Sequence, residues 1–208
     1  MSTEFKYRRL DKDESAVLLV DHQSGLCNIV GDFSPDDFKN NVLAVANAAK
    51  YFELPTILTT SFEQGPNGPL VPEIKELFPE APYIARPGQI NAWDNEEFVK
   101  AVKDTGKKQL IIAGVVTEVC VAFPALSAIE EGYDVFVVTD ASGTFNLTTR
   151  DAAWARMQAA GVQLMSWFGM ACELHRDWRN DMEGLGTLFS NHLPAYRNLI
   201  TSYNAPKQ

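Results

Sequence analysis

Three residues of the chain carry side chains that together could form a nucleophilic site. Asp21 directly follows an apolar run, Arg86 follows a second short apolar stretch, and Cys120 lies six residues beyond Gly114. A thiolate is a strong nucleophile, a carboxylate can accept the thiol proton, and a cation can balance the charge. These residue types therefore indicate covalent catalysis, with Cys120 as the nucleophile and Asp21 as the base.

Each of these residues also has an ordinary explanation. A carboxylate after a strand often caps a turn, an Arg there is usually a solvated or paired charge, and a Cys among apolar residues is usually a small core side chain. Their common location favours chemistry, because ligands bind beyond the carboxyl ends of the strands in an open parallel sheet. Cys120 is also expected at a helix start, where the helix dipole would favour the thiolate.

The elements that must position these residues are strands alternating with helices. Apolar runs predict buried strands at residues 16–20, 56–60, 82–85, 109–114, 134–138 and 162–165. Helical spacing of apolar residues predicts helices over about 34–54, 95–105, 118–130 and 148–160. This alternation predicts a three-layer α/β/α sandwich around a mainly parallel, roughly six-stranded Rossmann-like sheet, formed by a single domain over residues 1–208.

Residues from about 170 to 208 do not continue this alternation and are predicted to form a helical C-terminal arm. The arm contains Trp178, Phe189, Tyr196 and Tyr203. Two interpretations stay open: the arm covers the chain's own sheet, or it buries its aromatic side chains on a second subunit. Because closed symmetric assemblies are the usual oligomers, we expect a homo-oligomer held partly by this arm.

Composition restricts the partners and the compartment. The net charge of −9 argues against nucleic acid, whose phosphates require clustered Lys and Arg. The apolar run Ala16 to Val20 is too short to cross a membrane, and no apolar signal segment precedes it. Three cysteines do not form a disulfide framework. We therefore expect a cytoplasmic protein whose partner is a small-molecule substrate, without nucleic acid or membrane.

Several other kinds of site are missing from the sequence. No G-x-G-x-x-G follows a predicted strand, and neither a Walker A nor a G-x-S-x-G motif occurs. The three histidines, His22, His175 and His192, are scattered and form no ligand pair with an Asp. We expect no cofactor and no metal.

Three stretches of the chain match a known family. They are Leu-Val-Asp-His-Gln at 19–23, Ile-Ala-Arg-Pro-Gly-Gln-Ile-Asn-Ala-Trp at 84–93, and Ile-Ala-Gly-Val-Val-Thr-Glu-Val-Cys-Val at 112–121, the most specific of the three. Over roughly residues 8 to 205 the chain resembles the isochorismatase-like cysteine hydrolases. The resemblance implies catalysis by an Asp, a Lys and a Cys, with Asp21 and Cys120 at the matching positions and Asp21 deprotonating Cys120.

The resemblance implies three further features. A non-proline cis peptide bond is expected between Val115 and Val116, four residues before the Cys. It would direct the backbone amide of Val116, together with that of Cys120, into an oxyanion hole. The resemblance also implies a ring-like assembly of subunits.

The chain departs from the family pattern at two places. The Lys position is occupied by Arg86, whose planar fork is expected to clamp Asp21 bidentately and make it a weaker base. Nicotinamidase-like members bind a metal through Asp and His residues after the second strand. Here residues 61–70 contain no His and a single acid, Glu63, which again predicts that no metal is bound.

The leading hypothesis is a metal-independent cysteine hydrolase that cleaves a small amide or imide through a Cys120 thioester. A second hypothesis is a catalytically silent, oligomeric relative that binds a small molecule, which Arg86 in place of Lys favours. A third is a redox-sensing thiol, which depends on the expected low pKa of Cys120.

Overall fold

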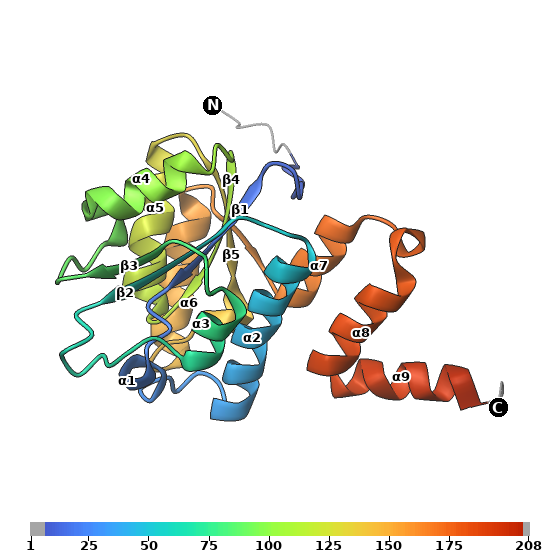
Figure 1. Cartoon of the computed structure of the whole chain (residues 1–208). Coiled ribbons are helices and arrows are strands. Elements are labelled where there is room, and N and C mark those ends of the chain that lie inside the picture. Colours follow the sequence, from blue (N-terminus) through green and yellow to red (C-terminus); the bar gives the residue numbers. More distant parts are fainter. Residues whose placement is uncertain (1–6, 206–208) are drawn as a thin grey trace.

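A six-stranded, entirely parallel sheet forms the centre of the computed structural model, which describes residues 7–205 (Figure 1). The strand order is β3-β2-β1-β4-β5-β6. The strands are β1 (Ser15–Val20), β2 (Thr56–Ser61), β3 (Tyr83–Arg86), β4 (Gln109–Gly114), β5 (Asp134–Val138) and β6 (Gln163–Met165). The predicted sheet is confirmed, with strand ends that differ from the prediction by at most one residue.

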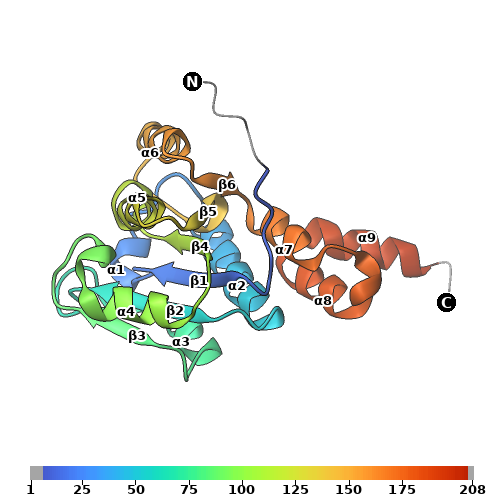
Figure 2. The ribbon, with the colours of Figure 1, turned by 90° about the horizontal axis from the view of Figure 1, so that it is seen from above.

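Helices cover both faces of the sheet, as Figure 2 shows from above. Along β1 the side chains alternate: Val17 and Leu19 join one core cluster, and Leu18 joins the other. The first cluster packs under α2 (Pro35–Tyr51), α3 (Pro72–Leu77) and α7 (Trp167–His175). The second packs under α4 (Glu96–Asp104), α5 (Ala122–Glu130) and α6 (Leu147–Ala159). The three-layer α/β/α architecture is therefore confirmed.

Polar residues define where the long helices begin. The side chain of Ser34 accepts a hydrogen bond from the amide of Asp37 at the start of α2, 3.2 Å away. Asn95 and Asn146 cap α4 and α6 in the same way, with distances of 2.9 Å. Such caps satisfy amides that have no partner inside the helix, so they fix the first turn of each helix after its loop.

The segment after β4 differs from the single helix predicted over residues 118–130. A π-helical turn covers Thr117–Val121, and α5 begins only at Ala122. In this turn the amide of Val121 donates to the carbonyl of Val116, 3.3 Å away. Cys120 therefore lies in a wide turn between β4 and α5, a type of distortion that is frequent at functional sites.

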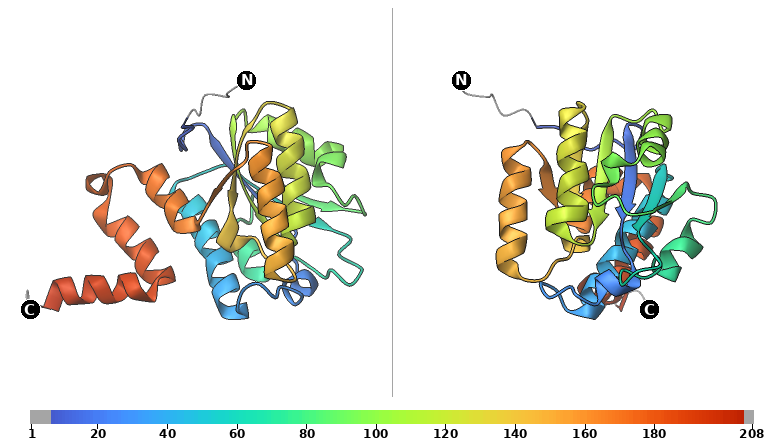
Figure 3. Two further views of the ribbon diagram at one scale, coloured as in Figure 1. Left: turned by 180° about the vertical axis from the view of Figure 1, so that it is seen from behind. Right: turned by 90° about the vertical axis from the view of Figure 1, so that its left-hand side faces the viewer.

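The C-terminal arm projects from the sandwich, as Figures 1 and 3 show. It consists of α8 (Met182–His192) and α9 (Pro194–Asn204). Phe189 is fully buried, with its ring centroid 5.8 Å from that of Trp167 in α7. Trp178 and Tyr196 stack on each other beside Phe189. Thus α8 covers the chain's own core, whereas α9 contains no buried residue.

The remaining α-helix, α1 (Ser24–Cys27), begins shortly after β1. Short 3₁₀ helices cover Ala92–Asp94, Thr139–Ala141 and Trp178–Asn180. Within residues 7–205 no helix combines the length and the apolar character needed to cross a membrane.

Candidate active site

The three predicted site residues lie at the carboxyl-end edge of the sheet. Asp21 follows β1, Arg86 is the last residue of β3, and Cys120 lies in the π-helical turn after β4. All three are buried, with 0% of Asp21, 1% of Arg86 and 9% of Cys120 exposed. Asp21 has a φ of 56°, and its amide donates to the carbonyl of Thr59, 2.9 Å away. This left-handed conformation is uncommon for Asp and directs the chain away from the strand.

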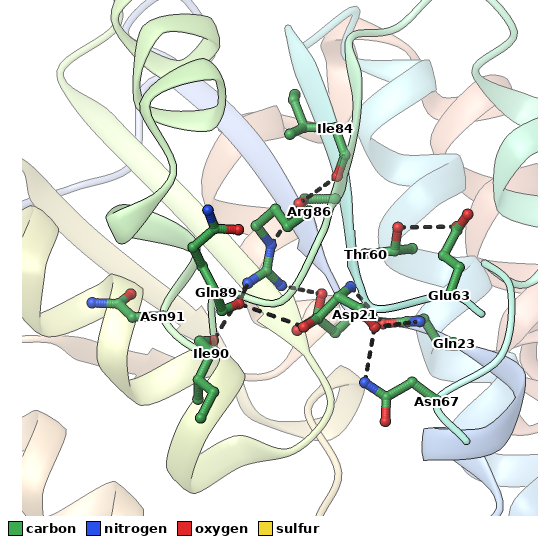
Figure 4. A network of polar contacts seen from close by, with 12 residues as sticks. Asp21, Gln23, Thr60, Glu63, Asn67, Ile84, Arg86, Gln89, Ile90 and Asn91 are labelled. Atoms are coloured by element: carbon green, nitrogen blue, oxygen red, sulfur yellow. Dashed lines mark hydrogen bonds and ion pairs between the residues drawn. The ribbon is translucent and has the colours of Figure 1, made fainter. Parts of the chain in front are cut away.

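Arg86 and Asp21 form an ion pair whose side chains are completely shielded from solvent (Figure 4). Nη2 of Arg86 donates to Oδ1 of Asp21 at 2.5 Å. The other guanidinium nitrogens bind elsewhere: Nε donates to Oγ1 of Thr59 at 3.0 Å, and Nη1 donates to the backbone carbonyl of Gln89. The expected bidentate clamp is therefore wrong, because the Thr59 hydroxyl and the Gln89 carbonyl bind the other two nitrogens and a single nitrogen reaches the carboxylate.

The second carboxylate oxygen of Asp21 is left open to the thiol. Oδ2 is buried and has no hydrogen-bond partner of ordinary geometry within residues 7–205. Burial raises the pKa of Asp21, and the charge and hydrogen bond of Arg86 oppose this effect, as does the interaction with the Cys120 thiol. The net effect is a carboxylate that binds a proton more readily than an ordinary Asp.

The thiol of Cys120 is held in its neutral form in this arrangement. Burial raises its pKa well above the ordinary value, and the negative charge of Asp21 and a hydrogen bond to it raise the pKa further. A hydrogen bond involving Val116 and the charge of Arg86 oppose these effects but do not outweigh them. The expectation that the helix dipole favours a free thiolate is therefore wrong, because desolvation and the adjacent carboxylate dominate.

The backbone just before Cys120 has an unusual geometry. The peptide bond between Val115 and Val116 is cis, where the resemblance to the family implies such a bond. The amide of Thr117 donates to the carbonyl of Gly143 at 3.0 Å. The amide of Val116 has no backbone acceptor in the described part of the chain and interacts with the Cys120 thiol. A polar N–H group is therefore available next to the nucleophile.

Two side chains that the sequence did not single out help to hold this edge together. Gln23 pairs with the backbone of Ser61: its Nε2 donates to the carbonyl at 3.0 Å, and its Oε1 accepts from the amide at 2.8 Å. The hydroxyl of Thr59 accepts a hydrogen bond from Nε of Arg86 and donates one to the carbonyl of Ile84. The spacing Asp-x-Gln was the available signal for Gln23, whereas nothing in the sequence distinguishes Thr59 from any other strand threonine.

The remaining polar candidates do not join the site. Glu63 accepts hydrogen bonds from Tyr83 and from Thr60. His22 is fully buried, and desolvation lowers its pKa to about 4. Desolvation raises the pKa of Cys27 to about 11. Among residues 7–205 no group of three His, Cys, Asp or Glu side chains is placed to hold a metal ion.

The chain matches known proteins over nearly its whole length. Residues 15–168 match the isochorismatase domain. The sequence is 78% identical over 198 residues to a probable hydrolase, YcaC of Escherichia coli strain K12, which covers 95% of each chain. Isochorismatase domain-containing protein 2 of Danio rerio is 27% identical over 81% of this chain and 83% of its own.

Solved structures give the same result. YcaC from Pseudomonas aeruginosa, with hexane-2,5-diol and covalent acrylamide, is 75% identical and superposes with a TM-score of 0.96 over 97% of this chain and 100% of its own. YcaC from Escherichia coli, described as an octameric hydrolase of unknown specificity, is 76% identical, also with a TM-score of 0.96, over 97% and 99% of the two chains. The chain therefore belongs to the isochorismatase family and is a hydrolase of that family.

Proposed function

We propose that the protein is a metal-independent cysteine hydrolase that cleaves the carbon–nitrogen bond of a small amide or imide through a thioester on Cys120. One observation carries this proposal. Asp21 binds Arg86 through one oxygen and keeps the other, Oδ2, without a conventional partner beside the Cys120 thiol. A base beside a thiol is the arrangement that activates a cysteine nucleophile.

In the first half of the reaction, Sγ of Cys120 attacks the carbonyl carbon while its proton passes to Oδ2 of Asp21. The carbon–nitrogen bond then breaks, and Asp21 returns the proton to the leaving amine. In the second half, Asp21 takes a proton from water as the water oxygen attacks the thioester. The carbon–sulfur bond breaks, the proton goes back to Sγ, and the acid leaves. Amide and water are thereby converted into acid and amine.

Arg86 would position the base and keep it charged. Without a cation, a carboxylate buried as completely as Asp21 would take up a proton and could no longer act as a base. With Arg86, burial still raises the pKa of Asp21. A general base works best when its pKa approaches the working pH, so the raised pKa favours proton transfer from the thiol. Arg in place of Lys is therefore compatible with catalysis in this arrangement.

The backbone amides of Val116 and Cys120 would stabilise the negative charge that forms on the carbonyl oxygen. The support is the amide of Val116, which has no backbone acceptor in the described part of the chain and interacts with the Cys120 thiol. A donor aimed at such an oxyanion contributes about 10²–10³ in rate. This arrangement needs no metal to polarise the carbonyl.

The assembly belongs to the same proposal. We infer that the chain forms a homo-oligomer in which α9 contacts a second subunit. Leu199 is 59% exposed and no residue of α9 is buried, although the helix carries several large apolar side chains. The Escherichia coli relative at 76% identity is described as octameric. Of the alternative functions, a redox-sensing thiol is disfavoured, because Cys120 is nearly buried and its pKa is raised.

Acyl-enzyme trapping tests the proposal. The oligomeric protein is incubated with a panel of neutral amides, imides and hydroxamates, and intact mass is followed with time for the wild type, Cys120→Ala and the matched control Cys172→Ala. We expect a transient acyl adduct and turnover in the wild type and in Cys172→Ala, and neither in Cys120→Ala. Turnover that persists in Cys120→Ala would refute the thioester.

Acrylamide provides a second probe of the nucleophile. A relative at 75% identity has been seen with covalent acrylamide. We expect the adduct in this protein to map to Cys120 by peptide mass spectrometry. Modification confined to Cys27 or Cys172 would contradict the assignment.

A further inference from the structure

The edge of the sheet that carries Cys120 offers no cation to a charged substrate. The segments that leave the carboxyl ends of the first five strands are residues 21–34, 62–71, 87–95, 115–121 and 139–147. None of them contains Lys or Arg, although the chain has 18 such residues. Arg86 ends β3, but all three of its nitrogens are already bound. The nearby Lys39 of α2 already pairs with Glu73 at 2.5 Å. These five segments therefore offer no free cation to a carboxylate or a phosphate.

Arg150, near the start of α6, does not fill this role. Its guanidinium binds Asp151 at 2.9 Å and lies over the ring of Trp154, 4.4 Å from the centroid. Its charge is thus already engaged within its own helix.

The same segments carry large apolar side chains that remain exposed. Their exposed fractions are 42% for Ile29, 50% for Phe62, 63% for Ile90, 50% for Phe145 and 54% for Leu147. We call these five residues the apolar rim. Elsewhere in residues 7–205, the large apolar side chains that are comparably exposed are Tyr7 and four residues of the C-terminal region. Exposed apolar side chains that gather around a nucleophile indicate a binding surface.

Two rim residues lie on either side of Arg86. The amide of Phe62 donates to the carbonyl of Arg86 at 2.9 Å. Nη1 of Arg86 donates to the carbonyl of Ile90 at 3.4 Å (Figure 4). Phe62 has a φ of 49°, a left-handed conformation that costs a bulky residue energy. The fold therefore holds a large aromatic side chain half exposed beside the site, where packing of the core does not require it.

The segments that carry Ile29 and Phe145 adjoin the turn that carries Cys120. The amide of Gly31 donates to the carbonyl of Thr144 at 2.8 Å, which brings the segments of Ile29 and Phe145 together. The hydroxyl of Thr144 donates to Glu118 at 2.6 Å, two residues before the nucleophile.

Three of the acids at this edge accept hydrogen bonds. Glu118 accepts from Thr144, Asp32 accepts from the amide of Thr144 at 2.8 Å, and Glu63 accepts from Tyr83. Oδ2 of Asp32 has no partner within residues 7–205 but is buried, and Asp94 is exposed after β3. The edge therefore excludes an anionic substrate by its lack of cations, and the acids do not exclude a cationic one.

We infer that the substrate is an amide or imide without a carboxylate or phosphate group, whose part beyond the scissile bond is apolar and contacts the apolar rim. This inference rests on the proposed function, because it describes the ligand of the same nucleophile. A carboxylate on the substrate would lose its bound water at this edge without gaining a cation, which is unfavourable. An alkyl or aryl group would bury apolar surface against Phe62 and Ile90, which is favourable.

Alkylation with matched reagents tests the inference on the intact oligomer. N-methylchloroacetamide, N-butylchloroacetamide and N-(3-carboxypropyl)chloroacetamide share one reacting group and differ in apolar length and charge. Rates at Cys120 are measured by peptide mass spectrometry and divided by the rates with N-acetylcysteinamide. The variants are Ile90→Lys, which adds a cation to the rim, and Met182→Lys, a control at an exposed apolar position in α8.

We expect the normalised rate of alkylation at Cys120 to be at least about tenfold higher with the butyl reagent than with the carboxypropyl reagent, which corresponds to roughly 1.4 kcal/mol. The butyl reagent should also react faster than the methyl reagent. Ile90→Lys should reduce the difference in rate between the butyl and carboxypropyl reagents, whereas Met182→Lys should leave it unchanged. Equal normalised rates for the three reagents would overturn the inference but leave Cys120 as the nucleophile. Equal effects of Ile90→Lys and Met182→Lys on these rates would have the same consequence. If none of the three reagents alkylated Cys120, the proposed function would be overturned, and this inference with it.

Discussion

Replacement of Arg86 by Met should destabilise the fold strongly at neutral pH. The Arg86–Asp21 pair has no solvent-exposed side-chain surface, so in the variant the buried Asp21 must either stay charged without a partner or take up a proton, and both cost stability at neutral pH. Breaking a buried ion pair in this way costs about 3–5 kcal/mol. For a chain of this size that corresponds to a decrease in Tm of about 6–20 °C. The acceptors Thr59 Oγ1 and the Gln89 carbonyl also lose their donor, which adds to the cost.

The destabilisation should depend on pH in a defined direction. Burial raises the pKa of Asp21, whereas Arg86 lowers it, so the variant raises this pKa further. A carboxyl group whose pKa is raised in the folded state stabilises the fold below its unfolded pKa, and this contribution is lost as pH rises through the folded pKa. The difference in stability between wild type and variant should therefore be larger at pH 8 than at pH 5.

Urea denaturation at pH 5 and pH 8, at one fixed protein concentration, measures both quantities. The matched control is Lys100→Met, which removes an ion pair with Asp104 whose partners are 73% and 61% exposed. Such an exposed pair contributes about 0–1 kcal/mol, so the control should be nearly unchanged. A loss below about 1 kcal/mol for Arg86→Met, or an equal loss at the two pH values, would refute the electrostatic reasoning.

Four further outcomes follow from the site and the arm. Alkylation of Cys120 by iodoacetamide should keep rising toward alkaline pH, because burial and Asp21 raise its pKa; a plateau at neutral pH would contradict this. Asp21→Asn removes that negative charge, so alkylation at pH 7 should become faster while hydrolysis stops, and faster alkylation with unchanged turnover would exclude Asp21 as the base. EDTA should leave hydrolysis unchanged, and activity lost to the chelator and restored by a metal would argue against a metal-free reaction. Truncation after Leu193 removes α9 and leaves the buried Phe189 in place, so light scattering should report a smaller assembly, and an unchanged mass would remove α9 from the interface.

The fold was predictable because its signals are local. Each strand is a short apolar run bounded by turn residues, and each long helix has apolar residues at helical spacing behind a capping residue such as Ser34 or Asn95. Parallel sheets bury both faces, which makes such runs continuous and easy to recognise. The rule that ligands bind beyond the carboxyl ends of parallel strands then selected Asp21, Arg86 and Cys120 as one group.

The chemistry inside that group depended on contacts that have no local signal. The sequence shows an Arg and an Asp, but only the backbone carbonyl of Gln89 and the hydroxyl of Thr59 determine that one guanidinium nitrogen, rather than two, reaches Asp21. The π-helical turn that carries Cys120 was likewise predicted as ordinary helix. The composition of this turn does not distinguish a π-helical turn from an ordinary α-helix.

Taken alone, the sequence determined the order of strands and helices, the edge of the sheet where chemistry occurs, and the absence of Lys and Arg from five segments of that edge. The tertiary structure decided the protonation of the site, because the pKa of Cys120 and that of Asp21 depend on desolvation and on charges brought together from three strands. It also divided the C-terminal aromatic residues, burying Phe189 in the chain's own core and leaving α9 exposed. Burial and electrostatic interaction are properties of three-dimensional neighbours, so they appear only when distant segments pack against one another.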